Sequence, residues 1–147
     1  MRPRRTERGS ALVELTWLGF LLLVPILWIV LAVFEVQRGA FGVSAAARSA
    51  GRAFALAPDD PTGRQQARAA VELALADQGI QDVGWQLEVT CGHLPDCHAG
   101  GAVITVTVRT KVKLPFVPDF MGGVATFALD AEHSVPIGQY QEPGAVP

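Results

Sequence analysis

The residues of this chain with the clearest potential for chemistry lie near its start: Gly9, Ser10 and Glu14. Glu14 is the one ionisable side chain in the 25 residues from Ser10 to Phe34. Carrying a carboxylate into a membrane-length apolar segment costs about 2.5–3.5 kcal/mol on insertion scales. An acid in that place is a candidate functional residue, and its chemistry would be to pair with a cation that enters the membrane beside it.

The segment that carries this acid has the length of a membrane-spanning helix. Residues 15–34 are 20 consecutive positions without a charge, and a helix of that length covers about 30 Å, the thickness of the hydrocarbon core. Pro25 removes one backbone hydrogen bond in its middle, which membrane helices tolerate. Four arginines precede the segment, so the positive-inside rule places the N-terminus in the cytoplasm and the rest of the chain outside it.

Three interpretations fit this segment. A secretory signal peptide has an apolar core of about 7–15 residues and an Ala-x-Ala-like cleavage site, whereas this core is longer and no good site closely follows it. A plain single-pass anchor accounts for the arginines and the length, with Glu14 reaching the nearby interface. The third interpretation is a segment that is cut at Gly9 and kept on the mature chain.

The run Gly9-Ser10-Ala11-Leu12-Val13-Glu14 resembles the processing site of type IV prepilins and pseudopilins. The resemblance implies that a membrane-bound prepilin peptidase cuts after Gly9. Ser10 then becomes the first residue, and Glu14 neutralises the new α-amino group of a neighbouring subunit during assembly.

The residues that follow narrow this resemblance. The chain continues with Pro25, then Glu35, and then an Ala/Arg/Gly-rich stretch at 45–52. In this order of features it resembles the TadE family of tight-adherence (Flp-type) pilus systems. One position differs, because Leu15 stands where that family often has Phe. The resemblance implies a minor pseudopilin or assembly component, which is a substrate of an enzyme and not an enzyme itself. Its implied partners are the prepilin peptidase, other pilins or pseudopilins, the pilus assembly platform and the lipid bilayer. The alternative is an uncleaved, membrane-anchored extracytoplasmic binding or adhesion module.

The charge of the chain is uneven, and this limits the possible partners. The first nine residues carry four Arg and one Glu, a net charge of +3, whereas the rest carries eight Lys or Arg against thirteen acids, a net charge of −5. A weakly acidic body argues against nucleic-acid binding. We find no phosphate-binding loop, nucleophile elbow or HExxH motif, and we expect no catalytic residue, cofactor or metal.

The pattern predicts an α+β protein with a cytoplasmic basic leader at 1–9, a transmembrane helix at 10–35 and an extracytoplasmic helical extension at 36–57. A small α+β head follows at 58–137, with a loose tail at 138–147. In the head we expect a second helix over 61–77, with Asp60 as its N-cap, Pro61 at its first position and Gly79 at its end. Its apolar face comes at helical spacing.

Three later stretches alternate between apolar and polar residues with a period of two, at 85–91, 104–114 and 127–135. This alternation predicts strands with one buried and one wet face, and hence a three-stranded antiparallel sheet with the second helix packed on it. In the third strand Phe127, Leu129, Ala131 and Val135 are expected to point inward, and His133 on the same face reads as a core histidine. Arg109, Lys111 and Lys113 form a basic stripe on the wet face, either guarding a sheet edge or meeting a partner.

Two cysteines, Cys91 and Cys97, flank a short loop between the first two strands. In an exported domain such a pair favours a disulfide. A metal site built from these cysteines with His93 and His98 is the alternative, but its spacing is poor for zinc. Earlier in the chain, Gly42, Ala46 and Ala50 recur every four residues and predict close helix packing, either between subunits or within the domain.

Overall fold

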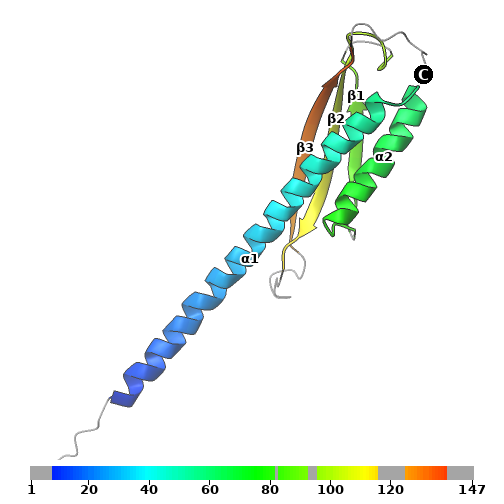
Figure 1. Cartoon of the computed structure of the whole chain (residues 1–147). Coiled ribbons are helices and arrows are strands. Elements are labelled where there is room, and N and C mark those ends of the chain that lie inside the picture. The colour runs from blue at the N-terminus through cyan, green and yellow to red at the C-terminus, as the bar shows by residue number, and fades with distance from the viewer. Residues whose placement is uncertain (1–7, 82, 93–95, 116–124, 139–147) are drawn as a thin grey trace, which may run out of the picture.

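The computed structural model describes residues 8–81, 83–92, 96–115 and 125–138, with the side chains of residues 8–10 left out. Two helices come first, α1 (Arg8–Ala55) and α2 (Asp60–Asp77), and three strands follow, β1 (Gln86–Thr90), β2 (Val103–Lys113) and β3 (Thr126–Pro136). The fold is therefore α+β, as the sequence predicts. Figure 1 shows α1 as a long rod whose first half stands clear of a small head built on its second half.

Helix α1 is one continuous element of 48 residues, with Pro25 inside it. The segments predicted separately at 10–35 and 36–57 are thus two halves of a single helix. The first half is rich in large apolar side chains, whereas the second half is rich in Ala and Gly, which allow other elements to approach closely. At about 1.5 Å per residue, the helix is roughly 70 Å long.

The sheet is antiparallel with the strand order β1-β2-β3. Ile104 on β2 lies opposite Val135 on β3, and Val89 on β1 lies opposite Val106 on β2, which brings the predicted apolar positions of all three strands to the same face. On β2 every second residue from Ile104 to Val112 is buried. The predicted alternation is therefore confirmed for β2, the central strand.

The packing on this sheet differs from the expected arrangement. The second half of α1 lies against β2 and β3, while α2 packs mainly against α1 and meets the sheet only weakly, near β1. Small residues on α1 make this possible, because Ala46 and Ala50 are completely buried in the core. The stripe of Gly42, Ala46 and Ala50 thus packs within its own domain. The prediction that the second helix would pack on the sheet is therefore wrong, because α1 occupies that position.

Helix α2 is held at both ends by local hydrogen bonds. Its N-cap is Asp59 and not Asp60 as predicted: the Asp59 carboxylate accepts a 2.8 Å hydrogen bond from the Thr62 backbone N–H. At the other end Gly79 adopts a φ of 73°. The Gly79 N–H donates to the Ala76 carbonyl and the Ile80 N–H donates to the Leu75 carbonyl. These two hydrogen bonds are the pair that defines a Schellman motif. Gly79 thus ends the helix as predicted.

Two further expectations about the sheet need correction. Phe127 lies on the predicted face of β3 but keeps 49% of its surface exposed, because at this end of the sheet only the middle of α1 lies opposite. The basic stripe of Arg109, Lys111 and Lys113 lies on β2, which is the central strand and not an edge. Guarding a sheet edge is therefore not its role.

Candidate functional site

Gly9, Ser10 and Glu14 lie in the first two turns of α1, at the end of the molecule far from the head. Ser10 and Glu14 are four residues apart, so they occur on the same side of the helix. Glu14 is exposed on the helix surface. The structure thus places the predicted cleavage site and the predicted pairing residue on one stretch of helix, roughly 65 Å of helix length from the top of the head.

The helix beyond Glu14 is exposed and strongly apolar. From Leu15 to Leu27 every residue is exposed, including Trp17 at 71% and Leu21 at 71%. The most apolar window of α1 has a mean hydropathy of 2.7, and none of it is buried in the protein. A helix with this length and composition is able to cross a membrane. Since it is not covered by its own domain, it is unlike the core helix of a soluble protein.

Contact between this exposed segment and the head begins at Trp28. The Trp28 indole Nε1–H donates a 2.8 Å hydrogen bond to the backbone carbonyl of Pro115, just beyond β2. From there to Gln37, α1 forms one wall of a groove of about 270 Å³ whose other wall is Leu114 and Phe127. Trp28 lies inside the predicted transmembrane segment, so the head begins before that segment ends.

At the opposite end of the head, Cys91 and Cys97 are joined by a disulfide. This bond uses both thiols of the alternative metal site, and His93 lies outside the described residues. Cys97 is almost completely buried among the core residues. The described geometry therefore favours a structural role for the two cysteines.

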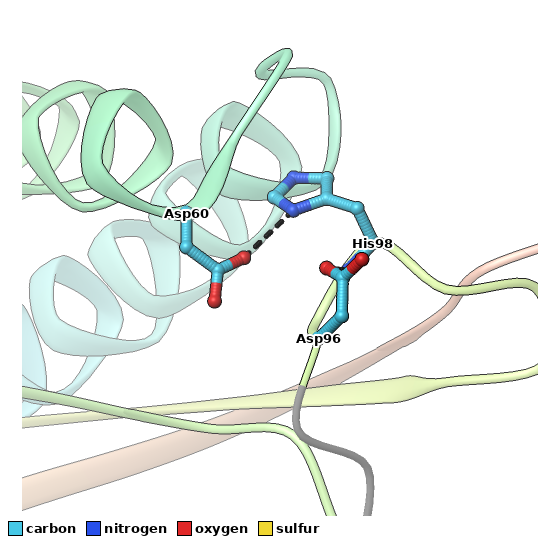
Figure 2. A group of neighbouring side chains, drawn as sticks. All are labelled: Asp60, Asp96 and His98. Carbon is cyan, nitrogen blue, oxygen red and sulfur yellow. Dashed lines mark hydrogen bonds and ion pairs between the residues drawn. The ribbon is translucent and has the colours of Figure 1, made fainter. Parts of the chain in front are cut away.

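Next to this disulfide, His98 ties the loop to both helices. Its Nδ1 faces the Asp60 carboxylate at the start of α2 (Figure 2), at a distance of 2.8 Å. Its Nε2 lies 3.0 Å from the Phe54 carbonyl near the end of α1. The His98 ring also stacks on the Phe54 ring at 5.3 Å. The His98 backbone N–H donates to the Asp96 carboxylate. We call His98, Asp60 and Phe54 the histidine tie.

Both ring nitrogens of His98 face hydrogen-bond acceptors. A carboxylate and a backbone carbonyl only accept hydrogen bonds, so both contacts are hydrogen bonds when both ring nitrogens carry a proton. In the neutral ring only one of the two nitrogens donates. Oxygen and nitrogen atoms of Asp60, Asp96 and His98 lie within 4.8 Å of one another. The hydrogen-bond contacts of these three residues with one another and with Phe54 explain why they lie so close together. They form a structural tie between the disulfide loop and the helices.

Sequence reasoning missed both Trp28 and the histidine tie as joining points. His98 is 38 residues from Asp60 and 44 from Phe54, and nothing in the spacing links them. Trp28 is 87 residues from Pro115, and no local pattern predicts that contact either.

Comparison of the chain with protein-family models, with curated proteins and with solved structures found no match. The resemblance to pseudopilins of the TadE type therefore depends on residues 9–52 of this sequence, and its functional content is a proposal.

Proposed function

We propose that this chain is a membrane-anchored pseudopilin of the TadE type, a minor subunit or assembly factor of a tight-adherence pilus. In this proposal a prepilin peptidase cuts after Gly9. The apolar half of α1 spans the cytoplasmic membrane, and the head lies outside the cytoplasm.

The observation that carries the proposal is the exposed first half of α1. It is a membrane-length apolar helix with the Gly9-Ser10 pair and a single acid at its start, and it continues without a break into the head. A plain anchor needs the length and the arginines, but it needs neither a glycine at position 9 nor an acid five residues later. A disulfide in the head agrees with an oxidising compartment outside the cytoplasm.

The role proposed for Glu14 follows from electrostatics. Cleavage after Gly9 creates an ammonium group at Ser10, at the edge of the lipid. An ammonium and a carboxylate that enter lipid as a pair cost far less than two separate charges. Glu14 of one subunit thus offers a partner to the new terminus of another and favours helices that stack side by side.

A glycine pair in the same helix tests the cleavage step. Gly9→Val puts a branched side chain next to the bond to be cut, so co-expression with a prepilin peptidase should leave the chain at its precursor size on a gel. Gly19→Val is the matched control, because a side chain at Gly19 meets nothing within 4 Å, and this variant should be processed like the wild type. Trimming of the Gly9→Val chain would argue against this peptidase.

Substitution of Glu14 tests the assembly step separately. We expect Glu14→Gln to insert into the membrane and to be cleaved normally, while incorporation into pili or pilus-assembly complexes is lost. Immunoblots of membrane and sheared surface fractions measure these two properties. Normal incorporation of the Glu14→Gln chain would leave Glu14 as an acid that only reaches the nearby interface, and would overturn its proposed role in pairing with the new terminus.

A further inference from the structure

The lower end of the head, next to the exposed half of α1, is apolar where a domain standing clear of a membrane would be polar. Its groove is lined by one polar residue and seven apolar ones: Gln37 and Trp28, Ile29, Ala32, Val33, Val36, Leu114 and Phe127. Phe127 is 49% exposed and Val33 48%. This apolar surface is continuous with the exposed apolar helix below it.

The length of the exposed helix sets where this surface lies. If Glu14 marks the inner boundary, crossing about 30 Å of hydrocarbon takes about 20 residues and brings the outer boundary to Phe34. Trp28, where the head first contacts α1, then lies about 9 Å inside that boundary. Any tilt of the helix requires still more residues to cross and places Trp28 no higher.

The polar groups at this level are arranged in a way that suits lipid. The Trp28 N–H and the Pro115 carbonyl satisfy each other across the junction, and backbone or indole groups left without partners in lipid would be costly. Just above the boundary, Glu35 and Arg38 form a 2.8 Å ion pair.

The basic stripe on β2 adds charge complementarity at the same end. Arg109 lies opposite Asp130 and makes a 3.0 Å ion pair with Glu88. By contrast, Lys111 and Lys113 lie opposite Ala128 and Thr126, which are uncharged. The two lysines flank Val112, which lies against Gly39, about 7 Å of helix above the boundary at Phe34. Their charge is therefore available to phosphate groups at the headgroup level.

We propose that the lower end of the head is embedded in the nearer leaflet of the membrane, and that acyl chains of phospholipids fill the groove between α1, Leu114 and Phe127. This inference rests on the proposed membrane span. It adds that the head is a partly immersed domain held at a fixed height, with Trp28 below the surface and the lysines at the phosphates.

Measurements of tryptophan depth in the bilayer test the membrane span and the immersion of the head separately. The full chain, reconstituted in phosphatidylcholine vesicles, is prepared with one native tryptophan at a time, the other two being replaced by Phe. Lipids brominated near the glycerol end or near the methyl end of the acyl chain quench tryptophans by contact. We expect strong quenching of Trp17 and Trp28, with Trp28 more sensitive to the shallow bromines, and almost no quenching of Trp85 in the head.

A reporter on the head itself completes the experiment. In a background in which Trp17, Trp28 and Trp85 are all Phe, Phe127→Trp should be quenched by the shallow bromines. Ser134→Trp, on the exposed face at the other end of β3, is the matched control and should not be quenched. The single-Trp28 chain keeps the bond to Pro115 and gives the same readout if a multiple variant misfolds.

The outcomes are distinguishable. An unquenched Trp17 would mean that the helix does not enter the bilayer, which defeats the proposed membrane span. A quenched Trp17 with unquenched Trp28 and Phe127→Trp would leave the span intact and overturn the immersion of the head. That second outcome is also expected if a second copy of the chain fills the groove instead of lipid.

Discussion

The two halves of α1 are the same secondary structure in two different environments. Between Ala11 and Leu27 the helix exposes Leu, Val, Trp and Phe side chains on all sides, whereas from Gly39 to Phe54 one face rich in small residues is buried against the sheet and α2. Two glycines make the contrast sharp. A side chain at Gly19 would meet nothing, while one at Gly39 would collide with Val112 and Leu129. The first half of α1 thus has room for a side chain at its glycine, whereas close packing in the second half requires a glycine at position 39.

This difference explains how one helix combines a first half that is apolar enough to cross a membrane with a second half that forms the core of the head. A helix surrounded by large apolar side chains has no preferred packing face and suits lipid. A helix with small residues at close intervals lets a sheet and a second helix approach its backbone. The change occurs between Trp28 and Gly39, which is also where the head begins.

The largest effect is expected from Phe54, which is completely buried near the end of α1. Phe54→Ala removes a core ring and its stacking on His98, and we expect it to lower the free energy of unfolding of the head by about 3–5 kcal/mol. The matched variant is Phe20→Ala, where 59% of the side chain is exposed, and the head should be unaffected. Thermal unfolding of the full chain in detergent, followed by Trp85 fluorescence, measures both. Equal losses for the two variants would break the distinction between the halves.

The glycine pair should give the next effect. The Cβ of Gly39→Ala would lie 2.5 Å from Val112 and 2.6 Å from Leu129, so these side chains must move, at a cost of about 1–3 kcal/mol. The better helix propensity of Ala offsets about 0.5–1 kcal/mol of this. Gly19→Ala lacks the collision, and no decrease in the melting temperature of the head is expected. A Gly39→Ala head that melts at or above the wild-type temperature would contradict the packing described for this half.

The histidine tie should contribute less. His98→Phe keeps an aromatic ring against Phe54 but removes the contacts of the ring nitrogens with Asp60 and with the Phe54 carbonyl. We expect a loss of about 1 kcal/mol, because the groups left behind are only partly buried and water replaces some of the lost bonds. Hydrogen exchange at the end of α1 and the start of α2 measures the local effect. Unchanged protection at both helix ends would show that the tie does not hold them together.

The smallest effect concerns the cap of α2. The hydrogen bond from the Thr62 backbone to the Asp59 carboxylate lowers the pKa of Asp59 below its usual value of 3.8. A lowered folded-state pKa means that the stabilisation is present above the unfolded-state pKa and is lost as the pH falls through the folded-state value. Asp59→Asn should therefore melt slightly below the wild type at neutral pH, and the difference should shrink as the pH falls below 3.8 and through the lowered folded-state pKa of Asp59. A difference that grows on acidification would contradict this account of the cap.

Much of the head could be predicted from the sequence, because alternation on β2 and the Gly79 stop are local signals. The errors arose where two local signals competed or where the decisive contact was distant. Asp59 and Asp60 are both acceptable caps, and only the backbone conformation selects Asp59. The choice of α1 over α2 as the helix on the sheet depends on how closely the small residues of α1 approach β2 and β3, which periodicity does not express. For the candidate site, Gly9, Ser10 and Glu14 were recognisable from their local pattern, whereas the Trp28 contact depends on where β2 ends, 87 residues later.

The most direct test of the account is the N-terminus of the mature chain. Intact-mass and N-terminal peptide analysis of the protein, purified from membranes of cells with an active prepilin peptidase, identifies it in one measurement. The account predicts a chain that begins at Ser10 and keeps the whole apolar half of α1. A chain that begins at Met1 or Arg2 in those cells, or one cut beyond the apolar segment, would contradict it.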